Sequence, residues 1–178
     1  MRTENFFPPG CVIADLHSGE KFDAIAELIR RAPVFQALPD RGALVEAVVA
    51  RERLQSTGLG HGVAVAHGRA TGVHRVLIGL GVHHSGMPWD SPDGEPVRLL
   101  FVIASPLSVS LDYLEALSGL VRCLRDSRIR ACLLDAADAS DIERRLREAF
   151  TAAAEGRTAA QRCTEMAGDP RPVGGAAG

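Results

Sequence analysis

A single α/β domain is predicted, with a mixed β-sheet of four or five strands flanked by helices. Along the 178 residues, short apolar segments with strand character alternate with segments whose apolar side chains recur at helical spacing. The most apolar stretch, Val97 to Ala104, is expected to be the central strand. The length is close to that of one domain, and the sequence contains no internal repeat and no second domain.

Three more strands are expected where runs of Val, Leu, Ile and Ala are bounded by turn residues. They are Val12 to Leu16, Val63 to Ala66 and Val73 to Val82. The segment Gly86 to Gly94 is expected to be a turn-rich connection, because it contains Pro88, Pro92 and Asp93-Gly94.

Two helices are expected in the first third of the chain. Ser18 is expected to cap the first helix, and Pro33 to end it. Asp40 is expected to cap the second, which runs to about Leu54. Their apolar faces consist of Phe22, Ile25, Leu28 and Ile29 in the first helix, and of Leu44, Val45, Val48 and Val49 in the second.

The segments after the central strand are helical in pattern. The first is a helix with leucines along one side, and a short segment from Ile129 to Leu134 comes after it. The last helix is indicated by a capping-box pattern from Ser140 to Glu143. The apolar positions are Leu111, Leu114, Leu117, Leu120 or Val121, and Leu124 in the first of these helices, and Ile142, Leu146 and Phe150 in the last. The domain is expected to span residues 1–154, and residues 155–178 to form a flexible tail, because periodicity fades after Ala154.

Composition argues against several classes of function. A net charge of −2 and a pI near 6.3 are not those of a nucleic-acid-binding protein. No apolar run approaches the roughly 20 residues that cross a bilayer, so membrane insertion is not expected. The four cysteines have no metal-ligand spacing, and the charged residues 1–7 do not form a secretory signal, which together predict reduced thiols in the cytoplasm. His83 and His84 would alternate to opposite faces of a strand, so no metal site is expected.

The most informative segment runs from Arg51 to Arg69. His67 follows an apolar strand and precedes Gly68, which predicts an imidazole held at the rim of the sheet. With an ordinary pKa of about 6.5, such a side chain is neutral often enough at cellular pH to act as a nucleophile. An isolated histidine at a strand end is more often structural, and an average arginine such as Arg51 is more often only solvated, so neither residue decides the function alone.

The same segment contains a glycine-rich loop from Ser56 to Gly60. Its hydroxyls and backbone N–H groups are of the kind that bind anions. The loop lacks the order of glycines and the lysine that a nucleotide P-loop requires. ATP and GTP binding are therefore not expected, and no cofactor is predicted.

Taken together, residues 51–69, RERLQSTGLGHGVAVAHGR, resemble the enzyme IIA domains of the fructose–mannitol class in the phosphoenolpyruvate-dependent phosphotransferase system (PTS). The standalone nitrogen-regulatory enzyme IIA belongs to the same class. The similarity continues through residues 89–97, 99–106 and 113–120, and it extends from about Val12 to Phe150. The resemblance implies the α/β fold of that class.

The resemblance also implies a mechanism. His67 would accept a phosphoryl group from a phosphohistidine carrier of the HPr type, and would pass it to an enzyme IIB domain or signal through its phosphorylation state. Arg51 would bind the phosphoryl oxygens, and Ser56 or Thr57 would add hydrogen bonds. Gly68 would let the donor's loop approach closely. No metal or cofactor is required.

Two positions depart from the family pattern. Ala66 stands where the family usually has a proline, and Tyr113 stands where it commonly has a second histidine. A tyrosine donates one hydrogen bond but does not become a cation near neutral pH, and the neighbouring Asp112 would repel a phosphate. Two functions therefore remain: a phosphocarrier, or a binding module that keeps the fold and docks to a regulated transporter or sensor protein without transferring phosphate. In either case the absence of an attached transport domain favours regulation over sugar transport.

Overall fold

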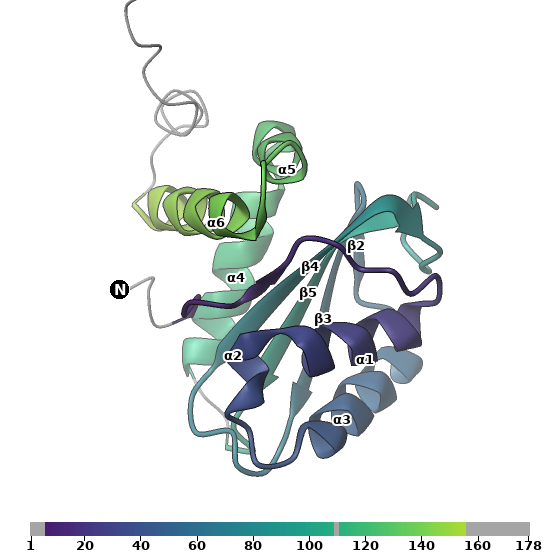
Figure 1. The fold of residues 1–178 in the computed structure, drawn as a ribbon, viewed down its shortest axis with the longest axis vertical. Helices are drawn as coiled ribbons and strands as arrows, with labels where there is room; N and C mark the ends of the chain where they lie inside the picture. The colour runs from purple at the N-terminus through teal and green to yellow at the C-terminus, as the bar shows by residue number, and fades with distance from the viewer. Residues whose placement is uncertain (1–5, 109–110, 156–178) are drawn as a thin grey trace, which may run out of the picture.

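The computed structural model describes residues 6–108 and 111–155 and confirms the predicted α/β fold (Figure 1). One mixed sheet has the strand order β1-β4-β5-β3-β2. Its central strand β5 pairs in parallel with β3 and antiparallel with β4. The strands are β1 (Val12–Ile13), β2 (Gly58–Gly60), β3 (Val63–Arg69), β4 (Leu77–Met87) and β5 (Val97–Ser105).

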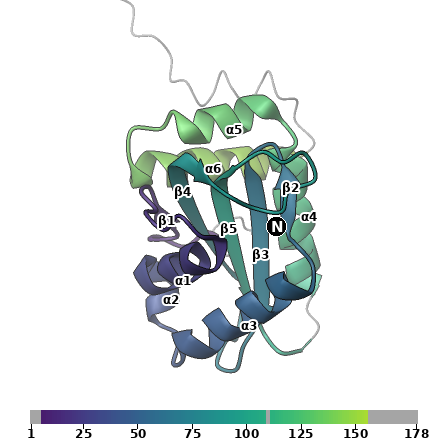
Figure 2. The same cartoon turned by 90° about the vertical axis from the view of Figure 1, so that its right-hand side faces the viewer.

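Helices cover both faces of this sheet (Figure 1). One layer holds α1 (Lys21–Arg31), α2 (Pro33–Gln36) and α3 (Arg41–Leu54). The other holds α4 (Leu111–Leu124), α5 (Ser127–Leu134) and α6 (Ala139–Ala154). In Figure 2, β4, β5 and β3 run side by side, with α5 and α6 at one end of the strands and α3 at the other.

The sheet face toward α1–α3 contains glycines at positions where α2, α3 and the segment before α1 lie close. A Cβ atom added at Gly79 would lie 2.6 Å from Cε2 of Phe35 in α2. One added at Gly81 would lie 2.3 Å from Cδ1 of Leu16, in the segment before α1. Alternation along β3 places Gly68 on the same face, against α3. Close packing therefore depends on glycine in both β3 and β4.

Capping of the helices follows the sequence in one case and departs from it in two. Asp40 caps α3 as predicted, since its carboxylate accepts a hydrogen bond from the Ala43 N–H at 2.8 Å. Ser18 does not cap α1, because its hydroxyl donates to Oε2 of Glu27 at 2.6 Å and the helix begins only at Lys21.

The second departure is at the last helix. Asp138 rather than Ser140 caps α6, and it accepts from the Asp141 N–H at 2.9 Å. Ser140 already lies within the first turn of the helix, so its side chain is past the capping position. The prediction was therefore right about a capped helix start and wrong about the capping residue.

Several strand boundaries also differ from the prediction. The strand expected from Val73 starts at Leu77 and continues to Met87, and the one expected from Val12 ends at Ile13. Gly58–Gly60, expected to be a loop, pairs with β3 as the strand β2. β3 extends past Ala66 to Arg69, so His67 lies within the strand.

The leucine-rich side predicted for α4 is only partly buried. Leu111 and Leu114 are 76% and 53% exposed, whereas the buried residues are Ala116, Gly119, Leu120, Cys123 and Leu124. The reason is α6, whose Phe150 packs so tightly on Gly119 that an added Cβ would lie 2.5 Å from its ring. From residue 156 onward, the predicted tail lies outside the described residues.

Candidate functional site

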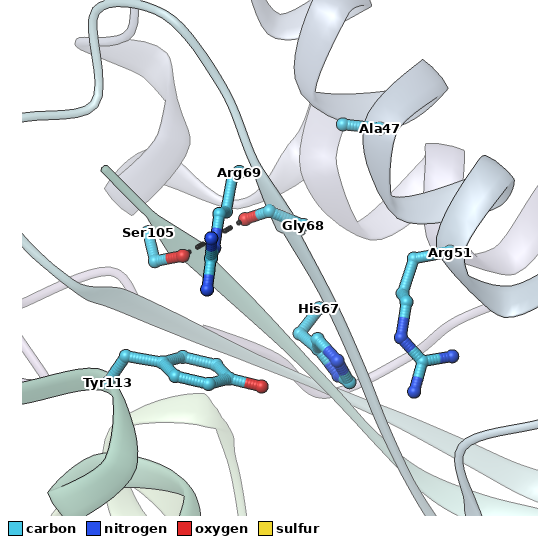
Figure 3. Close-up of a pocket in the computed structure, with 7 residues that line it drawn as sticks. All are labelled: Ala47, Arg51, His67, Gly68, Arg69, Ser105 and Tyr113. Atoms are coloured by element: carbon cyan, nitrogen blue, oxygen red, sulfur yellow. Dashed lines mark hydrogen bonds between the residues drawn. The ribbon is translucent and has the colours of Figure 1, made fainter. Parts of the chain in front are cut away.

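A pocket lies beside the C-terminal half of β3, between α3 and α4 (Figure 3). Strand β2 pairs only with the beginning of β3, where the Val65 N–H donates to the carbonyl of Thr57. The pocket beyond this pairing has a volume of about 330 Å³. It is lined by Ala47, Arg51, His67, Gly68, Arg69, Ser105 and Tyr113.

The half-buried His67 is held in a defined orientation. It pairs with Ile103 of β5 through the parallel ladder, which fixes its backbone. Its Nδ1 lies 3.2 Å from the carbonyl oxygen of Val65. A carbonyl oxygen only accepts, so this hydrogen bond requires the tautomer that carries its proton on Nδ1. In neutral imidazole, Nε2 then keeps its lone pair, the requirement for a nucleophile.

The surroundings of His67 favour that neutral form. Burial is the main cause that lowers the pKa of His67 below its usual value, and the positive charges of Arg51 and Arg69 lower it further. The hydrogen bond to Val65 and the buried carboxylate of Glu52 act in the opposite direction but are outweighed. The imidazole is therefore predominantly neutral at pH 7.

We expect the imidazole of His67 to titrate below pH 6.5, the value for an unperturbed side chain. Because the unfolded chain then binds more protons, the free energy of unfolding should fall as the pH falls below about 6.5. NMR titration of the ring, and urea unfolding of the wild type and His67→Gln between pH 5 and pH 7.5, measure both effects. A titration midpoint at or above 6.5, or the same pH slope in both proteins, would contradict this expectation.

Arg51 enters the pocket from the last turn of α3 (Figure 3). Its Nη1 donates to the carbonyl of Gln55 at 2.9 Å, which holds the guanidinium beside the end of the helix. A guanidinium has five N–H donors, so several remain for an anion in the pocket.

Tyr113 approaches His67 from the first turn of α4. The centroids of the two rings are 5.7 Å apart, and the hydroxyl end of Tyr113 points toward His67 in Figure 3. Burial raises the pKa of the Tyr113 hydroxyl, although Arg51 and Arg69 oppose the shift. The hydroxyl therefore stays protonated and acts as a hydrogen-bond donor.

The structure does not bring Ser56 and Thr57 into the lining of the pocket. The Thr57 side chain is buried, and its hydroxyl donates to Glu52. The Ser56 hydroxyl accepts from the Gly58 N–H at 3.3 Å. These two hydroxyls are thus engaged within the chain.

Gly68 lines the pocket, but its missing side chain serves a different purpose from the one expected. An added Cβ atom would lie 2.7 Å from Cγ2 of Val48 and 2.8 Å from the Val48 backbone nitrogen. Glycine at this position lets α3, and with it Arg51, lie directly against β3. The close approach is that of a helix of the same chain.

Glu52, which the sequence did not single out, holds the end of α3 in place. The residue is only 2% exposed, and its carboxylate accepts hydrogen bonds from both the N–H, at 3.0 Å, and the hydroxyl of Thr57. Nζ of Lys21, the single lysine of the chain, lies 3.7 Å from the carboxylate and 2.5 Å from that of Asp90. These contacts join α1, α3 and the start of β2 next to Arg51.

Replacing Glu52 by Gln should lower the free energy of unfolding by about 1–3 kcal/mol. The substitution removes the buried charge, and the side-chain NH2 group of glutamine would face either the N–H or the hydroxyl of Thr57, which are themselves donors. Urea unfolding measures the loss. Glu46→Gln is the matched control, because Glu46 is exposed on the same helix. Equal stability of the two variants would show that the buried contacts of Glu52 contribute little.

Three residues of the pocket were missed in the sequence: Ala47, Arg69 and Ser105. Ser105 is buried, and its hydroxyl lies 3.5 Å from the carbonyl of Gly68 (Figure 3). For Arg69 a signal was present, because alternate residues of a strand share a face and Arg69 follows His67 by two. Two arginines, rather than one, therefore flank the imidazole.

Within residues 6–108 and 111–155, no three His, Cys, Asp or Glu side chains are grouped so that they could hold a metal ion. In the same part of the chain, no helix has the length and apolarity needed to cross a membrane.

The family model described as "Phosphoenolpyruvate-dependent sugar phosphotransferase system, EIIA 2" matches residues 5–149. The chain belongs to this family. The match confirms the resemblance carried by residues 51–69 and covers the sheet and nearly all of the helical layers.

Nitrogen regulatory proteins and sugar-specific PTS components are both similar to this sequence. The nitrogen regulatory protein of Pseudomonas aeruginosa is 34% identical over 158 residues, which cover 86% of this chain and 92% of that protein. The nitrogen regulatory protein of Bradyrhizobium diazoefficiens is 31% identical over 80% of this chain and 92% of its own. The fructose-specific EIIABC component of Bacillus subtilis is 36% identical over 68% of this chain, but the matched part is only 19% of that protein.

A solved structure supports the same grouping. The nitrogen regulatory protein IIA-Ntr from Neisseria meningitidis superposes with a TM-score of 0.72 at 30% identity, covering 83% of this chain and 97% of that one. The family and fold of this EIIA chain are thereby shown by both sequence and structure.

Proposed function

We propose that this EIIA chain is a phosphocarrier in which Nε2 of His67 accepts a phosphoryl group from a phosphohistidine protein of the HPr type. The observation that carries the proposal is the state of His67: a half-buried, neutral imidazole whose Nδ1–H is bound to Val65, in a pocket between two arginines. An imidazole fixed in this way presents one nucleophilic nitrogen to an incoming phosphoryl group.

The transfer balances without any movement of protons. The Nε2 lone pair forms the new N–P bond as the N–P bond of the donor's phosphohistidine breaks. The donor ring, which carries a proton on its other nitrogen, takes the bonding electron pair and leaves as neutral imidazole. The Nδ1 proton of His67 stays in its hydrogen bond to Val65, so the phosphorylated ring carries a positive charge that the carbonyl oxygen stabilises. Such a transfer requires positioning and charge stabilisation rather than covalent help from other groups.

The neighbours of His67 supply that stabilisation. Arg51 offers N–H donors from α3 to the phosphoryl oxygens, and the protonated hydroxyl of Tyr113 offers one more from α4. The pocket needs neither nucleotide nor metal for this chemistry.

Exposed leucines near Arg51 and Tyr113 in the sequence suit a protein as the donor. Leu54 is 84% exposed one turn after Arg51 on α3, and Leu111 is 76% exposed in the first turn of α4, beside Tyr113. Leu107, before α4, is 60% exposed. These exposed leucines lie on or next to the elements that carry Arg51 and Tyr113, and we infer that the donor protein covers them.

Regulation in the cytoplasm is the role we favour, with a sugar-transport role second. The nitrogen regulatory proteins of Pseudomonas aeruginosa and Bradyrhizobium diazoefficiens are each matched over 92% of their own length. The acceptor or partner is then a regulated transporter or sensor protein, or an enzyme IIB domain. A protein of this fold, the Escherichia coli mannitol IIA enzyme, has been solved in complex with phosphorylated IIB.

Tyr113 favours a second candidate function. Because this side chain is a neutral phenol, the pocket lacks a cation at the position where the family commonly has histidine. A binding module that docks to its partner without transferring phosphate would tolerate this substitution.

The deciding experiment mixes the purified protein with phosphoenolpyruvate, enzyme I and the HPr-type carrier of the same organism. Intact mass spectrometry should detect the gain of one phosphoryl group that acid removes, and omission of enzyme I should prevent it. If the carrier is shown to be phosphorylated and this chain gains nothing, the docking module replaces the phosphocarrier.

A further inference from the structure

We infer that Arg69 is a second phosphate-binding residue, which clamps the phosphoryl group on His67 from the side opposite Arg51. The inference rests on the proposed phosphorylation of His67 and adds a phosphate-binding residue from the same strand. It begins from the three consecutive residues His67, Gly68 and Arg69 at the end of β3.

The geometry of the strand directs Arg69 to the same side as His67. Residues two apart in a strand share a face, and their Cα atoms are about 6.6 Å apart. Gly68 between them faces α3, as its approach to Val48 demonstrates. The ladder to β5 continues through the pair Arg69 and Ser105, so the backbone of Arg69 is as firmly placed as that of His67. Arg69 lines the same pocket (Figure 3).

The charges around the pocket leave Arg69 available. Among the described residues, Arg69 takes part in no ion pair, and its side chain is exposed. The carboxylate that acts on His67 is Glu52, which is buried and bound to Thr57. The pocket therefore has a surplus of positive charge, to which Arg51 and Arg69 contribute from two different elements.

Two arginines offer the phosphoryl group of the proposed ligand cationic hydrogen-bond donors from two sides. A phosphoryl group attached to a side chain carries roughly two negative charges at neutral pH. Tyr113 contributes a hydrogen bond but no charge, so Arg51 and Arg69 are the side chains of the pocket that can form charge-assisted hydrogen bonds to the phosphoryl oxygens. The electrostatic influence of Arg69 on both His67 and Tyr113, whose pKa values it lowers, agrees with its placement beside them.

An arginine at this position differs from a histidine in how its charge depends on pH. A guanidinium stays protonated throughout the physiological range, so the charge that Arg69 supplies is constant with pH. Around His67, the groups that face the ring are Arg51 and Glu52 of α3, Arg69 of β3 and Tyr113 of α4. The pH dependence of phosphoryl uptake should then follow the protonation of His67 itself.

The test compares Arg69→Ala and Arg69→Lys with Arg53→Ala. Arg53 is the matched control because it is also exposed, but its guanidinium lies over the Phe22 ring, 5.1 Å from the centroid, and does not line the pocket. The initial rate of phosphoryl uptake from the phosphorylated carrier should fall on the order of tenfold in Arg69→Ala, a factor typical of one charge-assisted hydrogen bond. It should partly recover in Arg69→Lys and be unchanged in Arg53→Ala.

Two NMR measurements separate phosphate binding from a structural role and from failure of the proposed function. The pKa of His67 should rise in Arg69→Ala and not in Arg53→Ala. Inorganic phosphate should shift the His67 ring resonances of the wild type more than those of Arg69→Ala. Equal uptake rates in the wild type and Arg69→Ala overturn the inference. If the wild type takes up no phosphoryl group, the proposed function fails. In that case, equal shifts of the His67 ring resonances in the wild type and in Arg69→Ala with inorganic phosphate overturn the inference by themselves.

Discussion

His67→Ala is expected to abolish phosphoryl uptake completely. Alanine has no nucleophilic nitrogen, and the other imidazoles of the chain are not among the residues that line the pocket. His67 is half-buried near the end of a strand, and its side chain makes one hydrogen bond, to Val65, so its loss should change the free energy of unfolding by about 1 kcal/mol. Intact mass after incubation with the phosphorylated carrier measures uptake, and urea unfolding measures stability.

His67→Gln and His84→Gln complete this experiment. The first keeps a polar side chain of similar size in the pocket, so its inactivity would follow from the missing imidazole rather than from a cavity. The second removes an exposed imidazole from β4, outside the pocket, and should leave uptake unchanged. Acid-labile phosphate on His67→Ala would mean that the acceptor is another residue.

The order of the main elements could be predicted because it depends on local patterns. Alternating strand and helix periodicity indicated the two layers, and Asp40 was recognisable as a cap because capping is a contact between residues three apart. Ser18 was misjudged because its actual partner, Glu27, lies nine residues away on α1. A sequence pattern can indicate a capping contact between residues three apart, but it does not indicate a contact that depends on how the chain folds back.

The candidate site shows the same division. His67 and Arg51 were indicated by the glycine-rich segment and its family resemblance, and the structure brings both to one pocket with Tyr113. The partner of Thr57 could not be predicted, because the buried position of Glu52 depends on how α1 and α3 pack together. Strand β2 was missed for a related reason, since its two glycines have poor strand propensity and the pairing with β3 decides its conformation.

Gly68→Ala is expected to lower the free energy of unfolding and to slow phosphoryl uptake as well. Its Cβ atom would meet Val48 at 2.7 Å and the backbone carbon of Ala47 at 3.1 Å, so α3 would have to move away from β3. Overpacking of this kind costs about 1–3 kcal/mol. Because α3 carries Arg51, the same movement would withdraw the guanidinium from His67 and slow uptake by an estimated tenfold or more. Urea unfolding and the uptake rate measure the two effects.

Gly19→Ala is the matched control, because an added Cβ there has no atom within 4 Å. A second comparison identifies the part of α3 that obstructs the methyl group. Val48→Ala would remove Cγ2 but would leave the Val48 backbone nitrogen, 2.8 Å from the new Cβ. In the Gly68→Ala background it should therefore restore little stability and little uptake. Full recovery in the double variant would instead mean that only the Val48 side chain is obstructed, and that glycine at this position is not what sets the distance between Arg51 and His67.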